Sequence, residues 1–354
     1  MDCLDVMNQL IIEARRRRAS DVHLTEGEPV WFRIHGTLMK MEDFSSLEAS
    51  VRDMLLSLMS EGTKAKFDQG QDVDFSWQSL DGCRQRVNIF RERKHIAATI
   101  RLLNDEIPTL EQLKIPTELY QMSEEPRGLI LITGPTGSGK STTLAAVIES
   151  LNQKYDRHII TIEDPIEYVY ENKKSLIHQR EVGADVTDFA SALRSSLRED
   201  PDVILVGEMR DYETIQAALL AAETGHLVLS TLHTTTAAQT VERIIDACPA
   251  ESQNQVRTQL SGVLKGILTQ CLIPCGGGVS RIAATELLMG TDAVLNLVRE
   301  GKTHQIPSMM QSSASIGMHT LNMDLSRLIK QGYITGEDAK RYTNHAAELE
   351  QYLQ

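Results

Sequence analysis

GLILITGPTGSGKSTTLAAVIESL, residues 128–151, is the stretch from which the architecture of this chain can be predicted. Its first part is an unbroken apolar run at 129–132, which is typical of a buried parallel strand. Its last part carries apolar residues at helical spacing: Leu144, Val147, Ile148 and Leu151. Between them, GPTGSGKS at 134–141 matches G-x-x-x-x-G-K-[ST]. Strand, glycine-rich loop and helix in this order predict a phosphate-binding loop.

The residue types in this loop suit the chemistry of nucleotide phosphates. Glycines let backbone N–H groups approach phosphate oxygens because no Cβ intervenes, and the following helix points its positive end at the same anion. We expect Lys140 to bridge the β- and γ-phosphates of ATP and the Ser141 hydroxyl to ligate Mg²⁺. The expected contacts with ATP are Gly134, Pro135, Thr136, Gly137, Ser138, Gly139, Lys140, Ser141 and Thr142.

Length, charge and cysteine content limit the kinds of protein that this chain can be. A length of 354 residues predicts two domains with room for a small appendage. The net charge of −13 argues against a general nucleic-acid binder. Five scattered cysteines indicate reduced thiols in a cytosol, and Cys271 and Cys275 have no second pair with which to build a zinc site. With no apolar run of membrane-spanning length and no signal peptide, any membrane role is expected to come through a partner.

The first hundred residues predict a small mixed α/β domain with an antiparallel sheet, residues 1–104, followed by a linker at 105–112. Alternating apolar residues mark its strands, and turn residues separate them. Strands are expected at 21–24, 30–34, 73–77, 84–90 and 95–103, and helices at 1–18 and 47–59.

The remainder predicts an α/β domain over 113–290 and a helical region over 291–354. Strands alternate with helices in the larger part, which implies a mainly parallel sheet. Its expected strands are 129–132, 158–162, 203–206, 226–232 and 282–288, and its expected helices are 110–122, 187–199, 211–224, 236–248 and 251–268. The C-terminal helices are expected at 292–300, 321–330 and 335–351.

Three later strands of this domain each end in a titratable residue. Glu163 follows the second strand, Glu208 the third and His233 the fourth. Ligands of open parallel sheets bind beyond the carboxyl ends of the strands, so these side chains are expected to face the phosphate loop. An ATPase needs a ligand for Mg²⁺ and a carboxylate that orients the attacking water. The three residues are therefore candidate catalytic residues.

Phosphoryl transfer also needs positive charge on the transferring group, often from an arginine of a neighbouring subunit. The phosphate loop itself contains no arginine. The candidates are Arg86, Arg93 and Arg101 in the first domain and Arg194 and Arg210 in the second. Each of them could instead form a surface ion pair.

Four segments together resemble the signature boxes of the type II/IV secretion ATPases. They are GPTGSGKSTT at 134–143, TIEDPIEY at 161–168, LREDPDVILVGEMRD at 197–211 and TGHLVLSTLHTTTA at 224–237. Three further segments are similar to the pilus-retraction branch of this family: SDVHL at 20–24, RVNIF at 86–90 and REGKTHQIPSMMQ at 299–311. The resemblance covers nearly the whole chain.

This resemblance implies a PAS-like N-terminal domain and a RecA-like ATPase domain in a homohexamer with ATP between subunits. It implies a cytoplasmic motor that lies at the inner face of the cell membrane, bound to an inner-membrane pilus platform protein and not to nucleic acid. By position, Glu163 would activate water, Glu208 with Ser141 would hold Mg²⁺, and His233 would contact the γ-phosphate region. Arg86, Arg93 and Arg101 match basic positions that reach toward nucleotide across domains or subunits.

One position departs from the retraction branch, which usually carries A-I-R-N-L in its C-terminal domain. Here the segment reads AVLNL at 293–297, with Leu295 where arginine is expected. An accessory retraction paralogue therefore remains an alternative to the main retraction motor. A pilus-extension or type II secretion ATPase is a further alternative, disfavoured because the four-cysteine zinc motif of the assembly branch is missing. Two hypotheses from other functional classes are a nucleic-acid motor and a nucleotide-gated adaptor that does not hydrolyse ATP.

Overall fold

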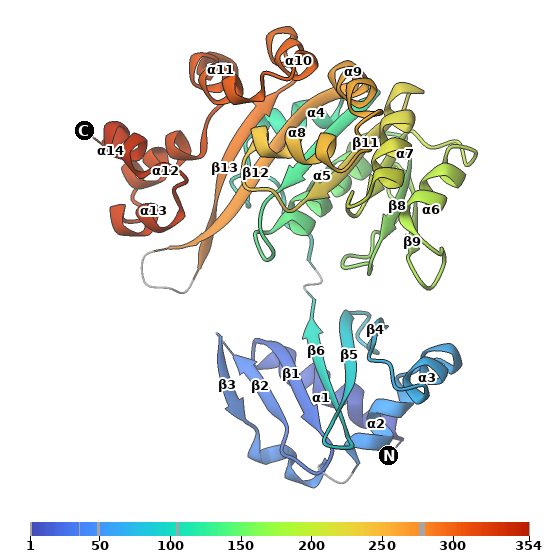
Figure 1. Ribbon diagram of the computed structural model, residues 1–354. Coiled ribbons are helices and arrows are strands. Elements are labelled where there is room, and N and C mark those ends of the chain that lie inside the picture. Colours follow the sequence, from blue (N-terminus) through green and yellow to red (C-terminus); the bar gives the residue numbers. More distant parts are fainter. Residues whose placement is uncertain (1, 35, 48–49, 104–105, 276–279, 354) are drawn as a thin grey trace. The chain divides into compact units, whose positions relative to one another are not determined.

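A computed structural model describes residues 2–34, 36–47, 50–103, 106–275 and 280–353, and Figure 1 shows its elements. The chain divides into two compact units. Unit 1 comprises Met1–Glu106 with Pro165–Val169, and unit 2 comprises Ile107–Asp164 with Tyr170–Gln354. The predicted boundary between residues 104 and 105 lies outside the described residues.

Unit 1 is an antiparallel sheet of six strands in the order β3-β2-β1-β6-β5-β4, with helices packed on its apolar face. The strands are β1 Ala19–Thr25, β2 Trp31–Ile34, β3 Thr37–Lys40, β4 Val73–Gln78, β5 Arg84–Glu92 and β6 His95–Leu102. The helices are α1 Cys3–Arg16, α2 Val51–Ser57 and α3 Glu61–Asp68, with a 3₁₀ turn at Glu42–Leu47. The antiparallel prediction is confirmed. The pattern of apolar residues did not predict β3 and α3, because β3 is exposed throughout and α3 buries only Phe67.

Unit 2 has a sheet of seven strands in the order β13-β12-β7-β11-β10-β8-β9, and all neighbours are parallel except β12 and β13. The strands are β7 Gly128–Thr133, β8 His158–Glu163, β9 Leu176–Glu181, β10 Val203–Val206, β11 Leu227–Leu232, β12 Leu264–Pro274 and β13 Arg281–Met289. The predicted mainly parallel sheet is confirmed.

Helices cover both faces of this sheet. They are α4 Thr117–Ser123, α5 Lys140–Lys154, α6 Phe189–Ser196, α7 Tyr212–Glu223, α8 Ala237–Asp246 and α9 Gln253–Val263. Side chains of β7 alternate between two cores, so that Leu129 and Leu131 pack with α6–α9 while Ile130 and Ile132 pack with α4 and α5. Both faces of the strand are therefore buried, which explains its unbroken apolar run.

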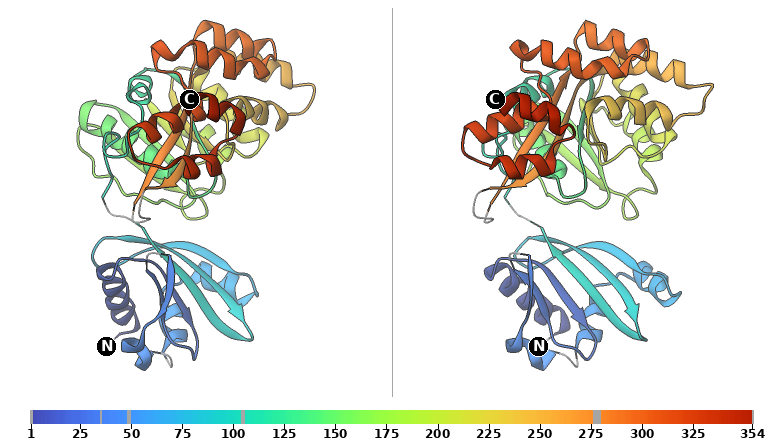
Figure 2. Two further views of the ribbon diagram at one scale, coloured as in Figure 1. Left: turned by 90° about the vertical axis from the view of Figure 1, so that its left-hand side faces the viewer. Right: turned by 60° about the vertical axis from the view of Figure 1, so that its left-hand side comes forward.

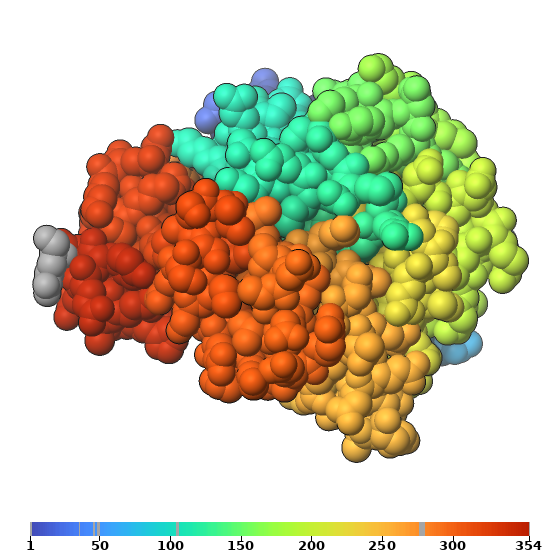
Figure 3. Space-filling view, turned by 90° about the horizontal axis from the view of Figure 1, so that it is seen from above, coloured from blue at the N-terminus to red at the C-terminus, as the bar shows by residue number. Residues whose placement is uncertain are grey.

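The C-terminal region continues with α10 Asp292–Arg299, α11 Ile306–Ser312, α12 Leu321–Lys330, α13 Gly336–Tyr342 and α14 Ala346–Leu353, and with 3₁₀ turns at Thr303–Gln305 and Ala314–Ile316. Figure 2 shows α12–α14 gathered beside the β12–β13 pair, and Figure 3 shows this region as one continuous orange-to-red surface. The single helix expected at 335–351 was wrong, because the chain is extended at Thr343 and a second helix begins at Ala346.

Two other predicted helices were too long. The helix expected at 251–268 ends at Val263, and Leu264 begins β12. Apolar residues at 264, 267 and 268 suit either element, but the segment pairs with β7 on one side and with β13 on the other. Gly266 lies so close to α4 that a Cβ there would be 2.4 Å from the sulfur of Met122. The helix expected at 110–122 begins only at Thr117, because Pro116 is its N-cap and disfavours helix before it.

A buried carboxylate fastens the C-terminal region to the sheet. Glu286 of β13 is 7% exposed and accepts hydrogen bonds from the backbone N–H of Ala237 at 2.7 Å and of Leu321 at 3.4 Å. Burial raises the pKa of the Glu286 carboxyl. Beside it, Asp324 accepts the backbone N–H of Thr285 at 2.8 Å. The first residues of α8 and α12 are thus held by the same strand.

No helix in the described ranges has the length and apolar character needed to cross a membrane.

Candidate nucleotide site

The phosphate loop follows the central strand of the unit 2 sheet. All of β7 is buried, and α5 begins at Lys140 with Gly139 as its N-cap at φ +90°. Gly134 has φ +141°, and a Cβ there would lie 2.2 Å from the carbonyl oxygen of Gln270. Any side chain would therefore displace either the loop or β12. The predicted order of strand, loop and helix is present in the structure.

The interior of the loop suits an anion. Lys140 Nζ lies over the loop and donates to the carbonyl oxygens of Gly134 at 2.8 Å and Pro135 at 3.1 Å. The Ser138 hydroxyl is buried and has no hydrogen-bond partner among the described residues. The N-terminus of α5 also presents backbone N–H groups at this point. A cation, a helix N-terminus and a glycine cradle fit the phosphates of a nucleotide.

Gln270 of β12 holds the loop through two hydrogen bonds, and it was not predicted as a site residue. Its side chain is 2% exposed. Nε2 donates to the Ser138 carbonyl at 2.7 Å, and Oε1 accepts from the Thr143 hydroxyl at 3.0 Å. The loop and α5 are thereby tied to β12. The sequence held no signal for this, because Gln270 lay beyond a segment predicted as helix.

The structure places the three strand-end residues along one edge of the sheet. His233 follows β11, Glu208 follows β10, and Glu163 ends β8, which are the successive neighbours of β7. Parallel strands share their carboxyl edge, so all three lie on the edge that carries the phosphate loop. Glu208 Oε2 is 3.4 Å from His233 Nε2 and 2.7 Å from Arg210 Nε. Glu208, His233 and Arg210 therefore form one cluster.

Glu163 lies apart from that cluster. Its Oε1 accepts a hydrogen bond from the Thr161 hydroxyl at 2.6 Å and from Gln179 Nε2 at 3.2 Å, and it is half-buried. With strands about 4.8 Å apart, β8 lies roughly 14 Å from β7. Glu163 therefore lies further from the loop than His233 and Glu208, on the same carboxyl edge of the sheet.

The two candidate arginines of unit 2 lie near Glu208. Arg194 of α6 and Arg210 line a cavity of about 460 Å³ together with Glu208 and Asp164. Arg210 remains 71% exposed at its side chain although it pairs with Glu208. Both arginines are placed where they can meet an anion that enters this cavity.

The three unit 1 arginines do not form one patch. Arg86 and Arg101 lie directly opposite each other on β5 and β6. Arg86 pairs with Asp74 at 2.8 Å, and Arg101 pairs with the buried Asp21 at 3.1 Å. Arg93 lies in the β5–β6 turn at φ +49°, seven residues or roughly 23 Å along the strand from Arg86. The structure thus brings Arg86 and Arg101 together and separates Arg93 from them.

A second cavity, of about 450 Å³, opens beside the phosphate loop. Its walls include Gly139 and Thr142, Leu272 of β12, Ile282 of β13, and Tyr333. A cavity with apolar walls and some polar groups beside a phosphate loop suits the base and sugar of a nucleotide. Leu272, Ile282 and Tyr333 were not predicted as site residues, because they come from elements far from the loop in sequence.

Three comparisons with known proteins bear on this site. A family model described as "Type II/IV secretion system protein" matches residues 3–337. The type IV pilus retractation ATPase PilT of Pseudomonas aeruginosa is 45% identical over 334 residues, which cover 94% of this chain and 97% of that protein. A twitching motility protein of Neisseria gonorrhoeae is 44% identical over 340 residues, which cover 94% of this chain and 90% of that protein.

A solved structure shares the complete architecture. The crystal structure of the pilus retraction motor PilT with bound ADP has a TM-score of 0.91 to this chain at 48% identity, and the match covers 98% of this chain and 99% of that one. The resemblance predicted from the four sequence boxes is therefore confirmed. This chain belongs to the type II/IV secretion system protein family.

Proposed function

We propose that this chain is an ATP-hydrolysing motor that powers retraction of a type IV pilus. It acts as a homohexamer with nucleotide at the subunit interfaces. Its place is the cytoplasm, at the inner face of the cell membrane, where it works on an inner-membrane platform protein of the pilus. Neither nucleic acid nor direct insertion into the membrane is part of this function.

The observation that carries the proposal is the carboxyl edge of the unit 2 sheet. There the phosphate loop, His233, Glu208 and Glu163 follow four adjacent parallel strands. Further support comes from similarity over 98% of the chain to a pilus retraction motor whose structure contains ADP. An edge with a cation, two carboxylates and an imidazole has the groups that hydrolysis of a phosphoanhydride requires.

The residues of this edge take different roles. Lys140 binds the β- and γ-phosphates, and the other residues of 134–142 supply backbone N–H groups and hydroxyls. Ser141 and Glu208 carry oxygen ligands of the kind that Mg²⁺ prefers, and bound Mg²⁺ neutralises negative charge on the phosphates. Glu163, on the same carboxyl edge of the sheet, orients the attacking water and accepts its proton. His233, held near Glu208, contacts the γ-phosphate.

The two carboxylates predict distinct defects. Glu163→Gln and Glu208→Gln are each expected to reduce the hydrolysis rate about a hundredfold or more, because a proton acceptor or a metal ligand is lost. Glu163→Gln should still bind Mg-ATP normally, whereas Glu208→Gln should weaken the dependence of binding on Mg²⁺. Steady-state phosphate release and ATP titrations at several Mg²⁺ concentrations measure both effects.

A matched control is Glu223→Gln, which changes an exposed glutamate at the end of α7 and should leave both measurements unchanged. If Glu163→Gln alters the Mg²⁺ dependence and Glu208→Gln does not, the two roles are exchanged. Normal turnover in either variant would remove that residue from the mechanism.

Deletion of the gene from its own organism tests the direction of the motor. Loss of a retraction motor should leave cells with excess surface pili and no twitching, because extension continues unopposed. Electron microscopy of surface pili and a twitching assay measure the two outcomes, with the wild-type chain supplied in trans as the control. Cells without pili would instead identify an extension motor.

Leu295 favours one alternative, an accessory retraction ATPase. It replaces the arginine that the retraction branch usually carries, and it packs half-buried against the larger core of unit 2. A charged guanidinium is therefore missing from the middle of α10. An accessory role would leave pilus number nearly normal in the deletion strain and would reduce only the force or frequency of retraction.

A further inference from the structure

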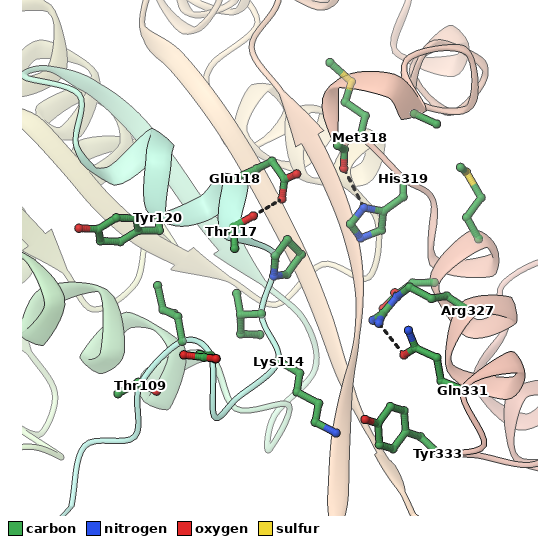
Figure 4. A pocket seen from close by; sticks show the side chains of 18 of the residues that line it. Thr109, Lys114, Thr117, Glu118, Tyr120, Met318, His319, Arg327, Gln331 and Tyr333 are labelled. Carbon is green, nitrogen blue, oxygen red and sulfur yellow. Dashed lines mark hydrogen bonds and ion pairs between the residues drawn. The ribbon is translucent and has the colours of Figure 1, made fainter.

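Two residues that line the cavity beside the phosphate loop contact each other. Gly139 and Thr142, Leu272 and Ile282, and Lys114 and Tyr333 all line this cavity. Lys114 Nζ lies 3.4 Å from the centre of the Tyr333 ring, which is a close cation–π contact. Figure 4 shows the two side chains facing each other. The pair joins a segment just before α4 to the turn between α12 and α13.

The backbone around Lys114 is held in an uncommon conformation. Lys114 has φ +56°, a left-handed value that residues with a Cβ rarely adopt. Hydrogen bonds from Lys114 N to Glu111 O at 3.0 Å and from Ile115 N to Leu110 O at 3.1 Å maintain it. Ile115 is buried in the core against α4 and α5 and anchors the segment. The ammonium group is therefore presented from a fixed point.

Behind the pair lies open space rather than a packed core. Lys114 and Tyr333 also line a second hollow, of about 1010 Å³, whose far wall is the polar face of α12. Arg327 on that face pairs with Asp324 at 2.7 Å and donates to Gln331 at 2.9 Å. Polar walls of this kind hold water. A small displacement of the Tyr333 ring toward this hollow therefore meets little steric resistance.

The backbone of Tyr333 is hydrogen-bonded to the end of α12. Its backbone N–H donates to the Leu328 carbonyl at 3.0 Å, which closes the C-terminal end of that helix. Gly332 just before it has φ +76°, as such a helix end requires. A push on the ring is therefore transmitted to α12 and to the helices packed with it.

We propose that the base of the bound nucleotide contacts the Lys114–Tyr333 pair, and that this contact conveys nucleotide occupancy to the C-terminal helices. The proposal rests on the proposed function, since it assigns the phosphates to the loop at Gly134–Ser141. The loop residues Gly139 and Thr142 line the same cavity as the pair. An aromatic ring and a cation both attract the π-face and the ring nitrogens of a purine.

The test compares a ligand with a base and a ligand without one. Calorimetric titrations of the full chain with ADP and with tripolyphosphate, both with Mg²⁺, give the two dissociation constants. Tyr333→Leu and Lys114→Met are expected to weaken ADP binding about five- to tenfold. Binding of tripolyphosphate should stay within about twofold of wild type, because it reaches only the loop. Tyr333→Phe and Lys114→Arg, which keep the ring and the charge, should retain most of the ADP affinity.

Controls separate this contact from a general loss of structure. Tyr342→Leu changes a tyrosine of α13 in the same helical core, and Lys330→Met removes an exposed lysine of α12; neither residue lines the cavity. Both should bind ADP as the wild type does. Equal loss of ADP and tripolyphosphate binding in Tyr333→Leu, or an unchanged ADP affinity, overturns the proposal.

Hydrogen exchange tests the coupling to the C-terminal helices. ADP is expected to slow amide exchange in residues 321–342, tripolyphosphate is not, and Tyr333→Leu should abolish the effect of ADP. Equal protection by both ligands would mean that phosphates alone act on these helices and would overturn the coupling. The proposed function itself fails if the wild type binds neither ligand and does not hydrolyse ATP. If the wild type binds ADP and hydrolyses ATP but the Tyr333 and Lys114 variants behave in the same way as the wild type, only this inference fails.

Discussion

Lys140→Ala is expected to abolish ATP hydrolysis, with a fall in rate of at least about a thousandfold. Lys140 Nζ lies within hydrogen-bond distance of the loop carbonyls, where we expect phosphate oxygens to bind. Alanine leaves the loop and the start of α5 in place but removes its cation. Charge that develops on the transferring phosphoryl group then has no compensation from the loop. Steady-state phosphate release on purified protein measures the loss.

Lys174→Ala provides the control for this variant. Lys174 is an exposed lysine outside the loop, and its replacement should leave turnover unchanged. Thermal unfolding of both variants shows whether either has lost its fold. Near-normal hydrolysis by a folded Lys140→Ala protein would show that residues 134–141 are not the catalytic phosphate loop.

Replacement of Arg86, Arg93 and Arg101 by alanine is expected to reduce hydrolysis roughly 10³-fold, the scale of an arginine supplied by a neighbouring subunit. Arg86 and Arg101 face each other across β5 and β6, and both are at least 42% exposed at the side chain although each has an acidic partner. The Arg86–Asp74 pair is exposed on both sides and is weak enough to exchange its carboxylate for a nucleotide phosphate, whereas the buried Asp21 would keep Arg33 as a neighbour if Arg101 moved away. Arg52→Ala, which removes another exposed ion pair of unit 1, should have no such effect.

Mixed rings show whether these arginines act across subunits. Lys140→Ala protein has intact arginines, and the triple arginine variant has an intact loop. In a randomly mixed ring, about one quarter of the interfaces therefore join an intact loop to intact arginines of the neighbouring subunit. Co-expression of the two inactive proteins should therefore restore part of the activity. If activity does not return, the arginines act within their own chain; if the triple variant alone is active, they are surface ion pairs.

The parts of the site that could be predicted are those that each lie in one short segment. The loop, Glu163, Glu208 and His233 each follow an apolar strand directly, and the parallel order of the strands places them on one edge. The apolar run and the glycine spacing of 128–141 leave little choice of local structure. Family resemblance then added the N-terminal domain and the expected roles.

The parts that could not be predicted depend on partners distant in sequence. Gln270 braces a loop more than a hundred residues away, and Tyr333 contacts Lys114 from a later element. The apolar positions of 264–268 suit a helix as well as a strand, and only pairing with β7 and β13 selects the strand. Likewise, Arg86 and Arg93 are close in sequence, but the extended strand β5 places them far apart in space.

The position of β7 also sets an order of events during synthesis of the chain. Gly128 pairs with Leu227, and Thr133 pairs with Thr269. The central strand can therefore pair with its neighbours only after roughly a hundred or more further residues have been synthesised. The loop takes its final conformation later still, because Gly134 and Ser138 contact Gln270 of the last parallel strand. A nascent chain therefore gains its nucleotide site late, when most of unit 2 has left the ribosome. From that moment the cell's own ATP, by binding only the finished fold, holds the molecule folded.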